Sequence, residues 1–182
     1  MEVGVAAHFL CGGIRIDEWC RTSIEGLFSA GEVAGGVHGG ARIGGNALAE
    51  LFVFGRRAGQ AAAAFANEQK GFQNLKTEQE ALNTEQERIE SIRAPKDGPR
   101  PGELRARLQQ TMWEHVSVIR NKKGLEKAIN TIAEIRSALP LIRMASTEKR
   151  YNLDLMAALE LDGMTELAGI IARSALLREE SR

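Results

Sequence analysis

The stretch GLFSAGEVAGGVHGGARIGGNALAELFVFGRRAG, residues 26–59, decides the fold of the first part of this chain. It predicts a turn and a short strand, then a glycine-rich loop that carries Glu32 and Arg42, and then a helix over about residues 46–67. Asn46 is a good N-cap residue for that helix. Backbone N–H groups at a helix start favour an anion or a polarised carbonyl oxygen, and an arginine can hold a carboxylate through two parallel N–H groups. The stretch is therefore a candidate ligand site.

The sequence on both sides of the loop adds to this prediction. Upstream, GGIRIDEW (residues 12–19) has alternating apolar residues and predicts a short strand. Within the predicted helix, apolar and small residues recur at helical spacing at Leu48, Leu51, Phe52, Gly55, Ala58 and Ala62. Gly55 and Gly59 make this stripe flat, so that a neighbouring backbone can approach it closely.

The composition limits the classes of protein to which this chain can belong. Its 182 residues are enough for one domain or two small ones, and 43% of them are hydrophobic, so a core can form. Because 24 basic residues balance 24 acidic residues, no overall field attracts nucleic acid, and we expect no such partner. No apolar run approaches the roughly 20 residues of a membrane-spanning helix. We expect Cys11 and Cys20 to be reduced thiols, and no metal site is predicted.

The chain divides by composition into three regions. Residues 1–66 hold most of the glycines, residues 67–102 are polar and predict a helical linker, and residues 103–182 are rich in Leu, Ile and Ala. The last region predicts three helices, at residues 103–120, 125–139 and 152–180. Their short connections predict an antiparallel three-helix bundle. The predicted fold class is therefore α+β, a small β/α piece followed by this bundle.

Each predicted bundle helix carries an apolar stripe that we expect to face the core. The stripes are Leu104, Leu108, Met112, Val116 and Ile119; Leu125, Ile129, Ile132, Ile135 and Leu139; and Leu155, Leu159, Met164, Leu167, Ile171 and Leu176. Periodicity of this kind indicates packing and gives no reason to expect a cofactor inside the bundle.

Residues 26–59 resemble the carboxy-terminal FAD signature of succinate dehydrogenase, fumarate reductase and L-aspartate oxidase flavoproteins. AHFLCGGIRID (residues 7–17) is similar to the family's His-x-x-x-Gly-Gly-Ile stretch. LQQTMWEHVSVIRNKKGLEKAINTI (residues 108–132) is similar to the start of the family's helical domain, and ALLREESR (residues 175–182) to its last helix. The resemblance covers nearly the whole chain in order. It implies that the small β/α piece is the carboxy-terminal segment of an FAD-binding domain.

The resemblance implies FAD as the cofactor and assigns roles to five residues. His8 and Arg42 correspond to the family's substrate-binding residues. Glu32, Ala47 and Leu48 correspond to residues that bind the cofactor. Many members have Ser in place of Ala47. Because alanine has no polar side chain, only the backbone N–H of that residue can donate to the cofactor here.

The loop departs from the family pattern at one point. Where members usually read His-Gly-Ala-Asn-Arg, residues 38–42 read HGGAR, so the role of the family's Asn is not carried over. We expect His38 to support the structure or the site rather than to bind substrate. No residue of this chain is predicted to be catalytic, because the resemblance places the proton-delivering Arg in a capping domain that this sequence lacks.

The resemblance implies an oxidoreductase that interconverts succinate and fumarate, with the flavin carrying the hydride. Both substrates are C4 dicarboxylates, so cationic or donor side chains must hold two carboxylates. The amino-terminal Gly-x-Gly-x-x-Gly signature, which binds the FAD pyrophosphate, does not occur in this sequence. We therefore expect a fragment of a larger flavoprotein that is inactive alone.

The expected partners are the C4 dicarboxylate, the missing FAD-binding and capping segments, and an iron–sulfur subunit. The expected location is cytoplasmic, or peripheral on the cytoplasmic face of a membrane through partner subunits. Two alternatives remain open at this point. One is a fragment of L-aspartate oxidase, which shares the motif. The other is a non-catalytic helical docking module whose flavin loop is vestigial.

Overall fold

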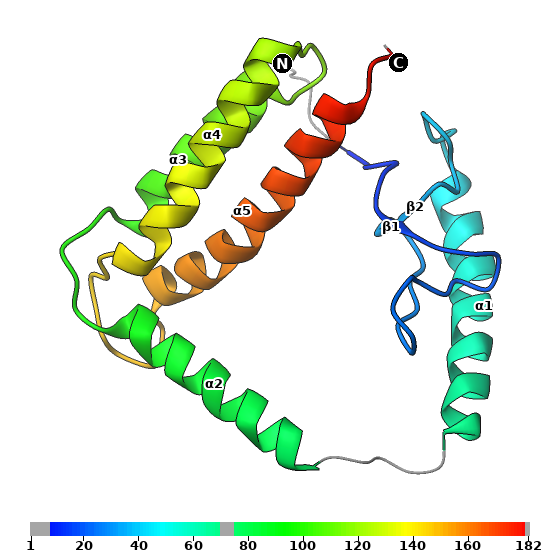
Figure 1. Ribbon diagram of the computed structural model, residues 1–182, viewed down its shortest axis with the longest axis horizontal. Helices are drawn as coiled ribbons and strands as arrows, with labels where there is room; N and C mark the ends of the chain where they lie inside the picture. Colours follow the sequence, from blue (N-terminus) through cyan, green and yellow to red (C-terminus); the bar gives the residue numbers. More distant parts are fainter. Residues whose placement is uncertain (1–7, 70–74, 181–182) are drawn as a thin grey trace. The chain divides into compact units, whose positions relative to one another are not determined.

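The computed structural model describes residues 8–69 and 75–180. The chain divides into two compact units whose boundary lies between Asn74 and Leu75. The first unit holds strand β1 (Ile14–Arg15), strand β2 (Ala34–Gly35) and helix α1 (Asn46–Glu68). The second holds α2 (Leu75–Arg93), α3 (Pro101–His115), α4 (Lys122–Ala138), the 3-10 turn η1 (Leu139–Leu141) and α5 (Leu153–Leu177), as Figure 1 shows.

The two strands of the first unit form a parallel pair, with Ile14 opposite Ala34. This pairing depends on Gly13, because a Cβ there would lie 2.2 Å from the carbonyl oxygen of Val33. The strand predicted at residues 12–19 is present but short. The second predicted strand, around Phe28, is reduced to an isolated bridge to Arg21, and the pairing strand lies further along the chain.

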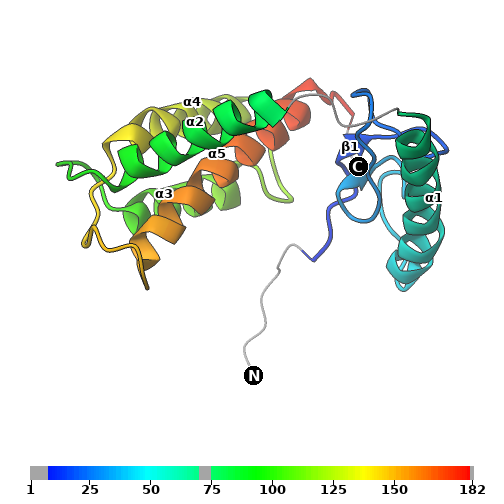
Figure 2. The same ribbon diagram turned by 90° about the horizontal axis from the view of Figure 1, so that it is seen from below.

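Helix α1 begins at Asn46, one residue earlier than the prediction of Asn46 as N-cap implies. The N-cap is Gly45, whose φ of 84° lies in the left-handed region that favours glycine, and Asn46 is the first helical residue. The prediction of Asn46 as N-cap was therefore wrong by one position. On its covered side the helix contacts the preceding loops: the ring of Phe65 meets Phe28 edge-on with centroids 6.1 Å apart. Figure 2 shows these loops along one side of the helix.

The predicted stripe on α1 is largely uncovered by the described chain. Leu48, Leu51 and Phe52 are exposed by 65%, 50% and 78% of their surface. A Cβ added at Gly55 or Gly59 would meet nothing within 4 Å. The flat face that the sequence predicts is therefore present, and the other described residues of the first unit do not pack a backbone against it at Gly55 or Gly59.

The second unit is a three-helix bundle of α3, α4 and α5, in which each helix contacts the other two. Successive helices run in opposite directions (Figure 1). Asn121 caps α4 by accepting from the N–H of Gly124 at 2.9 Å, and Asn152 caps α5 by accepting from Leu155 at 2.9 Å. The predicted fold class, α+β with an antiparallel three-helix bundle, is confirmed.

The bundle core contains most of the predicted stripe residues. Its buried members are Leu104, Leu108, Val116, Leu125, Ala128, Ile132, Ile135, Ile142, Ala158, Leu161, Ala168 and Ala172. Two predicted core residues were wrong: Ile119 is 90% exposed and Leu167 is 61% exposed. Because α3 ends at His115, Ile119 follows in a loop and leaves the helical face. On α5, small residues such as Ala168 and Ala172 face the core instead of Leu167.

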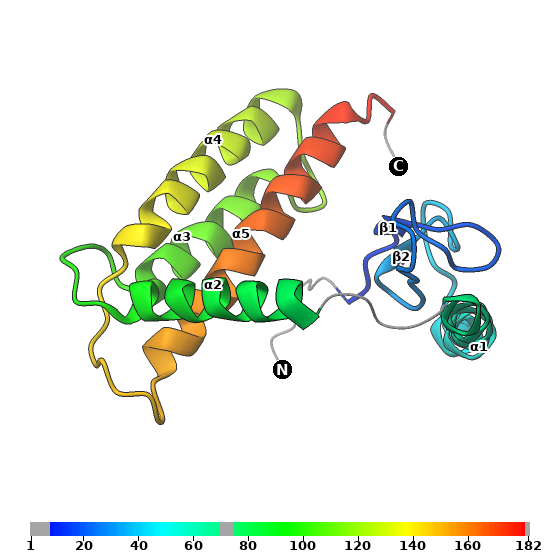
Figure 3. The ribbon, with the colours of Figure 1, turned by 60° about the horizontal axis from the view of Figure 1, so that its bottom comes forward.

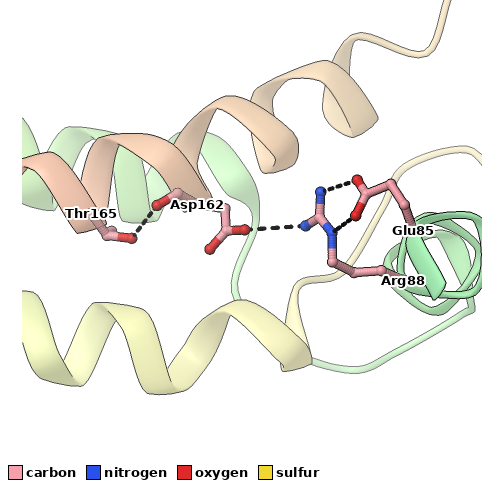
Figure 4. A network of polar contacts seen from close by, with 4 residues as sticks. All are labelled: Glu85, Arg88, Asp162 and Thr165. Carbon is pink, nitrogen blue, oxygen red and sulfur yellow. Dashed lines mark hydrogen bonds and ion pairs between the residues drawn. The ribbon is translucent and has the colours of Figure 1, made fainter. Parts of the chain in front are cut away.

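Helix α2 crosses the bundle and contacts α5 (Figure 3). Arg88 of α2 donates to Asp162 of α5 at 3.1 Å and to Glu85 of its own helix at 2.7 Å (Figure 4). The hydrogen bond from Arg88 holds the pKa of Glu85 below its usual range. The predicted linker, residues 67–102, includes this helix, and its residues 70–74 lie outside the described residues. The three-region division remains a prediction.

None of the helices in the described ranges combines the length and the hydropathy that crossing a membrane requires.

Two isoleucines of the second unit test the assignment of its core. Ile132 is 4% exposed, so Ile132→Ala should lower the free energy of unfolding by about 2–5 kcal/mol through lost contacts and a cavity. The matched control Ile119→Ala, at a residue 90% exposed, should change it by less than about 0.5 kcal/mol. Urea denaturation followed by circular dichroism measures both. Equal losses in the two variants would contradict the core described above.

Candidate functional site

A three-residue segment, His8-Phe9-Leu10, contains one of the five predicted site residues and contacts two others, Glu32 and Arg42, but not Ala47 or Leu48. The guanidinium carbon of Arg42 lies 4.3 Å from the centroid of the Phe9 ring. The backbone N–H of Leu10 donates to the Glu32 carboxylate at 3.0 Å. His8 directly precedes these two contacts and its side chain is exposed. Residues that the sequence places in separate stretches therefore meet at one segment.

Arg42 keeps much of its donor capacity. The side chain is half-buried, and its Nη1 donates to the carbonyl oxygen of Ile43 at 3.3 Å. Its Nε is buried without a hydrogen-bond partner among the described residues. No carboxylate of the described ranges forms an ion pair with Arg42. A guanidinium in this state can bind an external carboxylate by donating two parallel N–H hydrogen bonds to it.

The amino-terminal end of α1 offers donors to a ligand. Gly45 has no side chain that could cap the helix, and the first-turn N–H groups of any helix lack partners inside it. Ala47 is half-buried and Leu48 is 65% exposed. A Cβ added at Gly44 or Gly45 would meet nothing within 4 Å, so the space before this helix end is open. Free N–H groups, an open glycine backbone and an apolar Leu48 fit the carbonyl-bearing edge and the flat face of a flavin.

A buried hydrogen bond joins the glycine-rich loop to α1. His38 Nε2 lies 3.0 Å from the Glu50 Oε2 atom, and these side chains are only 10% and 2% exposed. The His38 ring also meets the Phe9 ring edge-on, with centroids 5.6 Å apart and planes at 73°. The sequence predicts a supporting role for His38 and overlooks Glu50. An acidic residue on the covered face of an otherwise apolar helix is the signal that could have revealed it.

The two cysteines lie in different surroundings. Both are free thiols; Cys11 is half-buried and Cys20 is fully buried. The Cys20 S–H donates to the carbonyl oxygen of Phe54 at 3.3 Å, which ties the β1 region to α1. Burial raises the pKa of the Cys20 thiol, although the charge of Arg57 acts in the opposite direction. Cys20 is therefore a structural residue.

Comparison with known proteins identifies relatives for both units. A family model described as "Fumarate reductase flavoprotein C-term" matches residues 105–182, and one described as "FAD binding domain" matches residues 1–48. One of the subunits of the fumarate reductase (CoM/CoB) of Methanothermobacter marburgensis is 44% identical over 185 residues, which cover 100% of this chain and 32% of that protein. The fumarate reductase flavoprotein subunit of Escherichia coli is 34% identical over 183 residues, covering 100% of this chain and 30% of that protein.

Solved structures similar to this chain come from the same family as these relatives. A mutant quinol fumarate reductase of E. coli superposes with a TM-score of 0.85 at 35% identity over 97% of this chain and 30% of that chain. Mycobacterium smegmatis Sdh1 superposes with a TM-score of 0.89 at 31% identity over 96% of this chain and 29% of that chain. The chain thus spans about a third of the length of the curated relatives it matches. Because these named relatives include fumarate reductases, the L-aspartate oxidase alternative is not favoured.

The different surroundings of the cysteines predict different reactivities. The thiolate is the form that attacks a disulfide reagent, and Cys20 is both buried and raised in pKa above its ordinary value of 9.0. In the native chain at neutral pH, Ellman's reagent should therefore modify Cys11 much faster than Cys20. Mass spectrometry of Cys11→Ser and Cys20→Ser chains separates the two rates. After denaturation in urea, both rates should become similar; rapid native labelling of Cys20 would contradict its burial.

Proposed function

We infer the function of this chain from its family, because it belongs to the succinate dehydrogenase/fumarate reductase flavoproteins and matches their carboxy-terminal part. We propose that it supplies this part of an FAD-dependent oxidoreductase that interconverts succinate and fumarate. The observation that carries the proposal is the meeting of His8, Arg42 and Glu32 around one short segment. Relatives named as fumarate reductases support the choice of substrate.

We propose that Arg42 and His8 bind the C4 dicarboxylate. A dianion needs cationic groups that are not already neutralised, and Arg42 has no carboxylate partner within the described residues. Its planar fork can hold one carboxylate through two parallel hydrogen bonds. His8 is exposed and directly precedes Phe9, on whose ring Arg42 stacks. It offers a further hydrogen-bond donor to the same ligand.

Glu32, Ala47 and Leu48 are the residues that would hold FAD. Glu32 is exposed, and a carboxylate can accept hydrogen bonds from hydroxyl groups of the cofactor. The backbone N–H groups at Ala47 and Leu48, at the positive end of α1, suit a flavin carbonyl oxygen. FAD, when bound, supplies the hydride carrier of the reaction. The residues of this chain orient that carrier and hold the substrate.

The uncovered stripe of α1 supports a larger assembly. Leu48 and Phe52 are exposed by 65% and 78%, and the flat positions at Gly55 and Gly59 are open. Since the chain spans about a third of its relatives, we propose that further FAD-binding residues pack on this face. The relatives are named as subunits, and we propose two further partners, a capping segment and an iron–sulfur subunit. The location proposed is cytoplasmic, peripheral to the membrane through those partners.

The 182-residue chain alone should show no succinate oxidation or fumarate reduction. It lacks the pyrophosphate-binding signature, so it cannot retain the hydride carrier. The measurement is dye-linked turnover of purified chain supplemented with FAD, with a complete flavoprotein containing the same chain as the positive control. Turnover by the supplemented chain would contradict the prediction. If the complete protein binds no flavin, the non-catalytic docking alternative is favoured instead.

In the complete flavoprotein, Arg42→Ala should damage catalysis far more than folding. Loss of a charged hydrogen-bonded contact in a partly desolvated site costs roughly 2–5 kcal/mol. That is about a thirty-fold to several-thousand-fold fall in kcat/KM, since each factor of ten corresponds to about 1.36 kcal/mol. Arg42→Lys should recover little activity, because an ammonium lacks the planar fork. Steady-state kinetics with fumarate measure the effect.

Arg57 provides the matched control for this substitution. Like Arg42 it stacks on an aromatic ring, that of Phe54 at 5.6 Å, but it lies on α1 outside the glycine-rich loop. Arg57→Ala should leave kcat/KM near the wild-type value. Flavin absorbance and melting temperature should remain near wild type in Arg42→Ala. Normal turnover of Arg42→Ala, or a loss explained wholly by unfolding, would show that Arg42 does not bind the substrate.

A further inference from the structure

We propose that Glu50, His38 and Phe9 are positioning residues that together hold the Arg42 guanidinium in its binding orientation. They form one line of contacts from α1 through the loop and the His8-Phe9-Leu10 segment to Arg42. The proposal rests on the proposed role of Arg42 in binding a dicarboxylate. It adds three residues, none of which touches the substrate.

The line begins with the buried hydrogen bond between Glu50 and His38. Glu50 is fixed on the first turns of α1, and its Oε2 lies 3.0 Å from His38 Nε2. Its other oxygen, Oε1, has no hydrogen-bond partner in the part of the chain that the structure describes. A buried carboxyl group is costly without a partner, so this one bond strongly favours a single orientation of the imidazole.

The imidazole then fixes the Phe9 ring. The two rings meet at 73° with centroids 5.6 Å apart, which is the edge-to-face arrangement that aromatic quadrupoles prefer. The far end of the segment is also tied, because the N–H of Leu10 donates to Glu32 at 3.0 Å. Phe9 is therefore held by the contact of its ring with His38 and by the hydrogen bond of the next residue, Leu10, to Glu32.

Phe9 in turn supports Arg42 through its ring face. The guanidinium carbon lies 4.3 Å from the ring centroid, well inside the range of a cation–π contact. Such a contact engages the face of the guanidinium, whereas its N–H groups lie in the plane and remain available to a carboxylate. The stack therefore restricts the long Arg42 side chain without consuming its donors. Restricting it before the ligand arrives lowers the entropic cost of binding.

The test compares substitutions in the complete flavoprotein. Phe9→Leu removes the ring while keeping an apolar side chain, and Glu50→Leu removes the acceptor of His38. The ligand is malonate, a dicarboxylate with no carbon–carbon bond between methylene groups to oxidise, and calorimetry gives its dissociation constant. Each variant should raise this constant roughly three- to thirty-fold, and KM should rise more than kcat falls. Phe9→Tyr and Glu50→Gln, which keep the ring and the acceptor, should restore binding.

A double-mutant cycle separates positioning from general packing. With Arg42→Ala already present, Phe9→Leu should weaken malonate binding no further, because the side chain that Phe9 holds is gone. Phe54→Leu is the matched control, since it removes the stack on Arg57 in the same unit. It should leave the malonate dissociation constant unchanged. If Phe9→Leu does not accumulate with flavin, Phe9→Met takes its place in the cycle.

The outcomes distinguish this proposal from the proposed function. If Arg42→Ala leaves malonate binding unchanged, Arg42 does not bind the dicarboxylate and both proposals fail. If Arg42→Ala weakens binding but Phe9→Leu has no effect, or the two effects add independently, only the positioning proposal is overturned. A fall in melting temperature with an unchanged dissociation constant in Glu50→Leu would likewise overturn it, because the pair would then serve folding alone.

Discussion

The hydrogen bond between His38 and Glu50 joins the glycine-rich loop of the first unit to helix α1. One partner belongs to the glycine-rich loop and the other to α1, and both side chains are almost fully buried. A loop with many glycines has high conformational entropy in the unfolded chain and few side chains to order it. The buried pair supplies the fixed point from which Phe9 and then Arg42 take their positions.

The two units are stabilised by different means. The bundle has an apolar core of leucine, isoleucine and alanine, and asparagine caps begin two of its helices. The first unit buries little apolar surface, and its buried residues include Cys20, Ser29 and Glu50. Much of its order therefore comes from hydrogen bonds and ring contacts. The apolar stripe left open on α1 is the surface on which we propose that further FAD-binding residues pack.

The proposed chemistry uses two kinds of positive charge at different places. The end of α1 offers the partial charge of unpartnered N–H groups, which suits the carbonyl edge of a flavin. Arg42 offers a full charge with a directional fork, which suits a substrate carboxylate. Because Arg42 lies on the loop that leads directly into α1, cofactor and substrate would be held by adjacent parts of one backbone. Hydride transfer requires the two reactants to be held in a defined mutual orientation.

The sequence by itself determined the helices of the bundle, its apolar faces and the residue types at the candidate site. Periodicity and capping are local, so the spacing of apolar residues alone assigns Leu108, Ile132 and Ile135 to the core. The resemblance of residues 26–59 to a flavoprotein signature indicated the family, which the relatives confirm. The roles of the five site residues remain predictions.

The tertiary structure alone decided which distant residues meet. The local sequence pattern does not predict that Arg42 stacks on Phe9 or that Glu50 bonds to His38. These contacts join stretches that are separated along the chain. It also decided that α3 ends before Ile119 and that the stripe on α1 stays open. Periodicity gives the faces of a helix but not its last turn or its partner, since both depend on packing against segments far along the chain.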